Sequence, residues 1–182
     1  MKIPNKSYII GYVGRLNYKE KGIDILLNAF EEFTQHNPDS ILLLIGEGED
    51  LESIQYFMNR KEMKIKIIPP KINIYEYYNI LDIIVLPSNI EPFGNVILET
   101  GLIKKPFIGA NVDGISEIIK NKHNGLLFAK GDVDDLIEKL ECFFCDKGFA
   151  DKCATNLYNE ILTKYTSDNV IPEIDRIYQN AS

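Results

Sequence analysis

The chain has 182 residues, of which 45% are hydrophobic and 26% are charged, a composition typical of one soluble globular domain. Its formal net charge of −7 argues against a broad nucleic-acid surface, because phosphate backbones are bound by clustered Lys and Arg side chains. No apolar run approaches the roughly 20 residues that span a bilayer, and the N-terminal residues 1–6 are too few and too polar for a signal peptide.

Strand-like and helix-like segments alternate along almost the whole chain. Short apolar runs rich in β-branched residues predict strands at 8–13, 41–45, 65–68, 83–86, 106–108 and 125–128. Helical spacing and capping residues predict helices at 22–35, after residue 50 to about 61, at 75–80, from about 94, from the N-cap Asp132, at 149–165 and at 168–179.

This alternation predicts an α/β fold: a single doubly wound, Rossmann-like domain with about six mostly parallel strands. Parallel neighbours need crossover connections, and helices supply them. In such sheets ligands bind outside the carboxyl ends of the strands, near the point where the strand order reverses. The loops that follow strands are therefore where binding residues are expected.

The cysteines do not indicate a metal site. Cys142 and Cys145 have C-x-x-C spacing, but they lie within an apolar helical pattern and no second Cys pair or His cluster accompanies them. We expect these two residues and Cys153 to be reduced thiols that are buried or half-buried.

The loop after the first predicted strand concentrates positive charge. Gly14 ends that strand, and Arg15, Lys19 and Lys21 follow just before a predicted helix. Helix N-termini attract anions, Arg offers a bidentate fork for phosphate, and Lys offers a mobile point charge. The pattern predicts an anion site, although three solvated surface charges would give the same sequence.

The loop after the second predicted strand, Gly46–Gly48, has G-x-G spacing, which by itself is also typical of a tight turn. The third glycine of the dinucleotide fingerprint is missing, and no acidic residue closes a strand about 20 residues further on. This loop therefore argues against an NAD-dependent dehydrogenase.

The loop after the fourth predicted strand runs from Pro87 into a helix and carries two glutamates. Glu91 lies in the loop, and Glu99 lies about one and a half turns into the helix. Carboxylates accept hydrogen bonds from sugar hydroxyls, and the backbone N–H groups of Gly94, Asn95 and Val96 at the helix start could donate to a phosphate. Glutamate spacing alone is not specific, because two solvent-facing charges would fit it equally.

Three segments together resemble the C-terminal domain of glycosyltransferase family four. They are Gly14–Leu16 followed by Lys21–Gly22, then Gly46–Gly48, then Ser88–Glu99, and the resemblance extends from about Ser7 to Leu140. It implies a retaining enzyme of the two-domain GT-B architecture. Residues 1–182 would be its nucleotide-sugar-binding, C-terminal half, with the N-terminal acceptor domain absent.

The resemblance also implies a role for each matching residue. Arg15 and Lys21 would neutralise the donor diphosphate, and Glu91 would hold sugar hydroxyls near C3 and C4. Glu99 would bind the ribose hydroxyls. The other donor-binding positions would be Gly14, Gly46, Phe93, Gly94, Asn95 and Val96. No metal and no cofactor would be needed, since the two cations stabilise the leaving diphosphate.

Three departures from the family pattern bear on these roles. The first loop is one residue longer than the common spacing, so Lys19 competes with Lys21, which we favour because Gly22 follows it. Pro69–Pro70 replaces a usual glycine near the expected base site and removes backbone donors. Asp113–Gly114 replaces Gly-Gly and adds a carboxylate near the donor side.

The resemblance predicts transfer of a hexose or related sugar from a UDP- or GDP-linked donor to a glycan or lipid-linked acceptor, in bacterial surface polysaccharide synthesis. The full enzyme would be cytoplasmic, with peripheral association at the inner membrane face, and would bind no nucleic acid. The isolated domain would bind its nucleotide weakly and transfer no sugar. Two alternatives stay open: a non-catalytic nucleotide-binding or interaction module, and part of a GT-B nucleotide-sugar epimerase.

Overall fold

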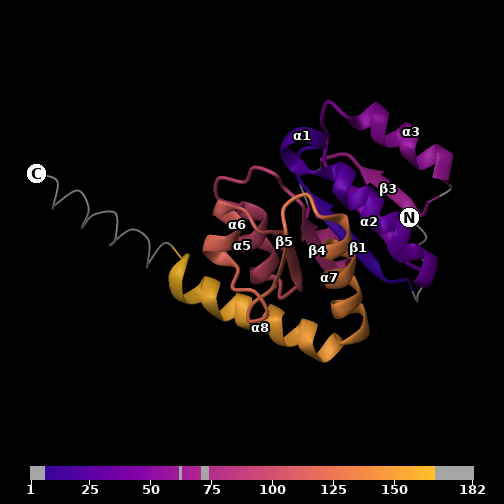
Figure 1. The fold of residues 1–182 in the computed structure, drawn as a ribbon. Helices are drawn as coiled ribbons and strands as arrows, with labels where there is room; N and C mark the ends of the chain where they lie inside the picture. Colours follow the sequence, from indigo (N-terminus) through magenta and orange to yellow (C-terminus); the bar gives the residue numbers. More distant parts are fainter. Residues whose placement is uncertain (1–6, 62, 71–73, 167–182) are drawn as a thin grey trace, which may run out of the picture.

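The computed structural model describes residues 7–61, 63–70 and 74–166, which form a single sheet flanked by helices (Figure 1). All pairings between the six strands are parallel, in the order β3-β2-β1-β4-β5-β6. The strands are β1 (Ile9–Val13), β2 (Ile41–Ile45), β3 (Ile65–Ile68), β4 (Ile83–Leu86), β5 (Phe107–Ala110) and β6 (Leu126–Phe128).

Eight helices accompany the described strands. They are α1 (Tyr18–Lys21), α2 (Ile23–His36), α3 (Leu51–Lys61), α4 (Tyr75–Ile80), α5 (Asn95–Leu102), α6 (Asp113–Ile118), α7 (Val133–Cys145) and α8 (Lys147–Lys164). Helices α1 to α6 lie in the crossover connections, and α7 and α8 follow the last strand. Helix α2 packs beside α7, while α8 packs against α5 at the other side of the molecule (Figure 1).

The core lies between the sheet and these helices. Every residue of β1, β2, β4 and β5 is buried, as expected of strands covered on both faces. Helix α2 contributes Phe30 and Phe33 to this core, and α7 contributes Leu140 and Phe143. The apolar periodicity of both helices therefore turns one stripe of each toward the sheet.

The strand order reverses at β1. From β1 the chain proceeds to β2 and β3 on one side, then crosses to β4 and continues outward to β5 and β6. The connections after β1 and β4 consequently leave neighbouring strands in opposite directions, which opens a crevice at their carboxyl ends. The two loops with the most distinctive sequences, after Val13 and after Leu86, both begin at this crevice.

The predicted α/β fold is confirmed, and each predicted strand lies within two residues of an observed one. Two short helices, α1 and α6, were not predicted, although α4, which is as short as α6, was. The helix expected at 149–165 begins earlier, at Lys147, because the Asp146 side chain accepts a hydrogen bond from the Phe149 N–H and caps it. The helix expected at 168–179 lies outside the described residues.

The expectation for the cysteines was wrong for two of them. Cys153 is buried, whereas Cys142 and Cys145 are exposed on α7. Helix α7 turns Leu136, Leu140 and Phe143 inward instead. The described helices include none that is long and apolar enough to cross a membrane.

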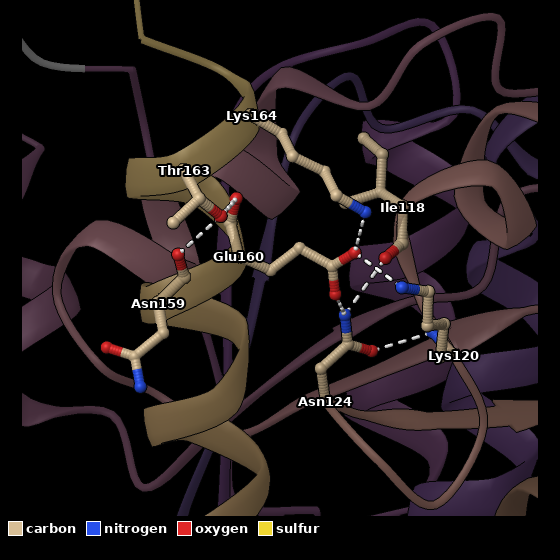
Figure 2. A network of polar contacts seen from close by, with 7 residues as sticks. All are labelled: Ile118, Lys120, Asn124, Asn159, Glu160, Thr163 and Lys164. Carbon is tan, nitrogen blue, oxygen red and sulfur yellow. Dashed lines mark hydrogen bonds and ion pairs between the residues drawn. The ribbon is translucent and has the colours of Figure 1, made fainter.

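A polar network holds α8 to the connection between α6 and β6 (Figure 2). The Glu160 carboxylate accepts hydrogen bonds from Lys120 Nζ at 2.7 Å, from Lys164 Nζ at 2.6 Å and from the buried Asn124 amide at 2.7 Å. Asn124 also donates to the Ile118 carbonyl at 3.0 Å. Burial by itself would raise the pKa of Glu160, but the hydrogen bonds and charges of Lys120 and Lys164 outweigh it and hold that pKa below its ordinary value.

Candidate functional site

The loops that follow β1 and β4 are tied to each other by main-chain hydrogen bonds. The Glu20 carbonyl accepts from the N–H groups of Asn89, at 2.8 Å, and Ile90, at 3.1 Å. The Asn89 side chain donates to the Lys19 carbonyl at 3.1 Å. These bonds use the backbone of α1 to fix the start of the Glu91 segment, so the short unpredicted helix has a structural part in the site.

Across this junction Lys21 and Glu91 form an ion pair, with Nζ 2.8 Å from Oε2. Their side chains are only 20% and 14% exposed, and the Ser88 hydroxyl donates to the same carboxylate oxygen at 3.2 Å. Lys19, the competing cation in the sequence, is exposed and meets this loop through its carbonyl oxygen. The geometry thus places Lys21, rather than Lys19, beside Glu91.

A cavity of about 380 Å³ opens beside this pair. Its walls come from the end of β1, the end of β4 and the start of α5. The lining residues are Tyr12, Val13, Gly14, Arg15, Lys21, Leu86, Glu91, Pro92, Phe93, Gly94, Asn95 and Val96. Eight of the ten predicted site residues therefore surround one space: Gly14, Arg15, Lys21, Glu91, Phe93, Gly94, Asn95 and Val96.

A second cavity, of about 530 Å³, lies on the other side of the β1 loop. Its lining residues are Val13, Gly14, Arg15, Ile45, Gly46, Glu47, Gly48, Glu49, Pro70 and Ile74. Val13, Gly14 and Arg15 line both cavities. Arg15 therefore lies on the wall that the two cavities share, and Lys21 lies on the wall of the first cavity.

Glycines make this close packing of loops achievable. At Gly46 the φ angle is 154°, and a Cβ atom there would lie 1.8 Å from the Gly14 carbonyl oxygen. Gly94 has a φ of 83°, a left-handed conformation, at the N-cap of α5. The turn at Gly94 starts the helix so that the N–H groups of Asn95 and Val96 stand at the edge of the first cavity.

Tyr12 was not predicted as a site residue, because in the sequence it is one more apolar position of a strand. Its hydroxyl donates to the Arg15 carbonyl at 2.7 Å and it lines the first cavity. Burial, with the negative charge of Glu91 as a second cause, raises the pKa of Tyr12 well above its ordinary value. The phenol therefore stays protonated and continues to donate to the Arg15 backbone.

Glu99 is the predicted site residue whose position differs most from the others. It is not among the described residues that line either cavity. Its Oε2 accepts a hydrogen bond from the buried Tyr78 hydroxyl at 2.5 Å. Tyr78, on α4, was not predicted as a site residue either, since nothing in the sequence links it to Glu99.

The departures from the family pattern also have definite positions. Pro70 lines the second cavity. Asp113 is exposed at the start of α6. Gly114 donates its N–H to the Glu91 carbonyl at 3.1 Å, and a Cβ atom there would lie 2.1 Å from that oxygen. A glycine at position 114 is therefore required for the Glu91 loop to pack against the start of α6.

Arg15 forms an ion pair with Glu49, which was not predicted as a site residue. Arg15 Nη2 lies 3.0 Å from Glu49 Oε2, and the side chains are 60% and 56% exposed. Within the described residues no group of three or more His, Cys, Asp and Glu side chains is arranged to hold a metal ion. Glu47 also lines the second cavity, so Glu47, Glu49 and Glu91 together place three carboxylates against the two cations Arg15 and Lys21.

A parallel sheet whose order reverses at β1, with a cavity at the ends of β1 and β4, defines a doubly wound α/β domain with a ligand crevice at its switch point. Residues 1–160 match the family model of the glycosyl transferases group 1, and the chain belongs to that family. The expected family and the Rossmann-like, C-terminal GT-B fold are thus confirmed.

Several known proteins are similar to this chain. The capsular polysaccharide biosynthesis glycosyltransferase CapM of Staphylococcus aureus is 29% identical over 180 residues, which are 97% of this chain and 47% of that protein. The chain spans about half the length of the curated relatives it matches.

Among solved structures, the C-terminal domain of the group 1 glycosyl transferase LpcC from Francisella tularensis is 28% identical with a TM-score of 0.80, covering 88% of this chain and 87% of that one. HepE of Anabaena, in complex with UDP-glucose, is 22% identical with a TM-score of 0.87. The match covers 96% of this chain and 49% of that one.

Proposed function

We propose that this chain is the donor-binding part of a retaining glycosyltransferase that moves a hexose or related sugar from a UDP- or GDP-linked donor to a glycan or lipid-linked acceptor. The observation that carries the proposal is the position of Arg15 between two cavities, with Lys21 and Glu91 on the wall of one of them. A nucleotide sugar needs two such spaces with cations near their junction.

The two cavities suit different parts of the donor. The larger one has apolar walls from Ile45, Pro70 and Ile74 and is suited to the base and ribose. The smaller one has the Glu91 carboxylate and the start of α5, which are suited to sugar hydroxyls and to phosphate. The diphosphate would then lie beside Arg15, where the cavities meet.

In this arrangement the transfer step is assisted by charge. As the bond from the sugar anomeric carbon to the diphosphate oxygen breaks, an acceptor hydroxyl oxygen bonds to that carbon and loses its proton to solvent, and negative charge develops on the leaving diphosphate. Arg15 and Lys21, which line the same cavity, would stabilise that charge, and the N–H groups of Asn95 and Val96 would donate to it. We propose that these groups, and not a bound metal ion, offset the charge of the diphosphate.

Glu99 would act on the ribose through its remaining carboxylate oxygen. Its Oε2 is engaged by Tyr78, so Oε1 is the atom we assign to the ribose hydroxyls. Because Glu99 does not line either cavity in this structure, the assignment requires that the ribose reach toward α5 from the larger cavity.

The whole protein's activity is proposed from its relatives. CapM is named for capsular polysaccharide biosynthesis, and a role in surface polysaccharide synthesis at the cytoplasmic face of the membrane is our proposal for the enzyme to which this domain corresponds. The 182-residue chain by itself should bind a nucleoside diphosphate and transfer no sugar, because the acceptor-binding domain of a GT-B enzyme is a separate half.

Calorimetric titration of the chain with UDP and with GDP tests the proposal. We expect saturable binding of one of them, weakened about tenfold or more in Arg15→Ala, since a charge-assisted hydrogen bond is worth about 1.5–3 kcal/mol. Glu99→Ala should weaken UDP or GDP binding without affecting the binding of inorganic diphosphate. Unchanged affinity in both variants, or no saturable heat in the parent chain, would refute the site assignment.

A further inference from the structure

We propose that Glu49 is a positioning residue for the donor: it orients the Arg15 guanidinium at the junction of the two cavities before the nucleotide arrives. The inference rests on the proposed donor site and concerns a residue outside the sequence signature. Arg15 Nη2 and Glu49 Oε2 are 3.0 Å apart, and this contact uses one of the five N–H donors of the guanidinium. The remaining donors stay available for phosphate oxygens.

Glu49 is held from the opposite side by Asn17. The Asn17 amide nitrogen donates to Glu49 Oε1, while Arg15 engages the other carboxylate oxygen. Asn17 is only 5% exposed, and its side-chain oxygen accepts from the Glu20 N–H at 2.7 Å as the N-cap of α1. An amide bonded at both its nitrogen and its oxygen has little freedom to rotate, so it fixes the carboxylate that it holds.

The backbone around Glu49 is also fixed. The Leu16 N–H donates to the Glu47 carbonyl at 2.8 Å, and the Tyr18 N–H donates to the Asp50 carboxylate at 2.7 Å. A Cβ atom on Gly48 would lie 2.1 Å from the Leu16 carbonyl oxygen. The turn after β2 therefore packs directly on the loop after β1, which keeps the backbone of Glu49 close to the loop that carries Arg15.

Positioning matters here because the Arg15 side chain is 60% exposed and Arg has many rotamers. A free guanidinium would have to be ordered when the diphosphate binds, and ordering one such side chain weakens binding by about two- to tenfold. With Glu49 in place, the Arg15 side chain is already ordered when the protein folds, so its ordering no longer weakens nucleotide binding. The carboxylate has an opposing effect, since its charge repels the diphosphate, and the test must separate the two.

Comparison of Glu49→Gln with Glu49→Ala separates geometry from charge. Both variants lose the negative charge. The Gln amide oxygen can still accept from Arg15, although its NH2 group then replaces the oxygen that accepts from Asn17, whereas Ala offers Arg15 no acceptor at all. We expect Glu49→Ala to bind UDP or GDP, whichever the parent binds, about two- to tenfold more weakly than Glu49→Gln does.

The same pair of substitutions in an Arg15→Ala background completes the cycle, because a residue that acts through Arg15 has no effect when Arg15 is gone. There we expect equal affinities for the Gln and Ala variants. Glu138, whose side chain is 77% exposed on α7, provides the matched control, and its Gln and Ala variants should bind equally in either background.

The possible results are distinguishable. If the parent chain binds neither UDP nor GDP, the proposed function fails and this inference fails with it. If the parent binds but Glu49→Gln and Glu49→Ala have the same dissociation constant, only the positioning role is overturned. A difference between the two that persists in the Arg15→Ala background would also overturn it, because Glu49 would then act on the loop and not through Arg15.

Discussion

The Lys21–Glu91 ion pair should contribute to folding as well as to binding, which gives a prediction that needs no ligand. At 2.8 Å and an effective dielectric constant near 20, the direct attraction is about 6 kcal/mol. Desolvation of two side chains that are mostly buried offsets most of this. Fully exposed pairs contribute about 0–1 kcal/mol, and breaking fully buried pairs costs about 3–5 kcal/mol. We therefore expect an intermediate value.

The perturbation is Lys21→Met, which keeps the length and the apolar stem but removes the charge. It leaves the Glu91 carboxylate, 14% exposed, with the Ser88 hydroxyl as a donor at 3.2 Å. We expect a loss of about 1–3 kcal/mol in the free energy of unfolding. Glu91→Gln should cost less, since a Lys ammonium group that is 20% exposed can move toward water.

Urea denaturation followed by circular dichroism measures both losses. With a slope of about 1–3 kcal/mol per molar urea, Lys21→Met should lower the midpoint by about 1 M at an unchanged slope. The double variant should be more stable than the sum of the single losses predicts, with a coupling of about 1–2 kcal/mol. Two single variants within about 0.5 kcal/mol of the parent, or strictly additive losses, would refute the reasoning.

Three further predictions concern other parts of the structure. Tyr78→Phe removes the hydroxyl that donates to Glu99 and should weaken UDP or GDP binding by about three- to tenfold in calorimetry. Gly46→Ala should lower the free energy of unfolding by more than about 2 kcal/mol in urea, because its Cβ atom would lie 1.8 Å from the Gly14 carbonyl oxygen. Glu160→Gln should destabilise the chain at pH 7 by about 1 kcal/mol, and this difference should shrink as the pH falls.

The sign of the last prediction follows from the lowered pKa of Glu160. A carboxyl group whose folded pKa is depressed stabilises the fold above its ordinary value of 4.5, and loses that contribution as the pH falls through the folded pKa. Urea midpoints of the parent and the variant should therefore converge in acid. A gap that stays constant between pH 7 and pH 3 would contradict the assigned cause.

The predictions for Tyr78→Phe and Gly46→Ala would each be contradicted by a different result. Tyr78→Phe with unchanged nucleotide affinity would show that Glu99 needs no support from α4. Gly46→Ala with an unchanged urea midpoint would mean that the loops after β1 and β2 can separate without loss. Gly148→Ala on α8 is the matched control for the latter, because the nearest atom to its added Cβ is 3.5 Å away.

The fold could be predicted from sequence because its signals are local. The runs at 41–45 and 83–86 are apolar throughout, and the chain returns to a helix after each, which already implies a parallel sheet. The helices that escaped prediction, α1 and α6, have four and six residues. Hydrogen bonds to neighbouring loops stabilise such short helices more than their own apolar periodicity does.

The site was only partly predictable from the sequence. The residues that match the family pattern could be recognised, but the residues that hydrogen-bond to them could not. Arg15, Lys21 and Glu91 carry a chemistry that a family pattern records, and the structure places all three on one cavity. Glu49 and Tyr78 are distant in sequence from the residues they contact, and no periodicity relates them. Such pairings depend on how loops from separate strands pack, which a single sequence does not encode locally.

The most direct test of the account is a map of backbone amide chemical shifts of the ¹⁵N-labelled chain during titration with UDP and, separately, GDP. We predict that one nucleotide shifts the amides of Gly14, Arg15, Gly46, Asn95 and Val96 with a single dissociation constant, and that amides at the far edge of the sheet stay unchanged. Shifts confined to residues outside the two cavities, or no saturable shifts with either nucleotide, would contradict the assignment of this crevice as a donor site.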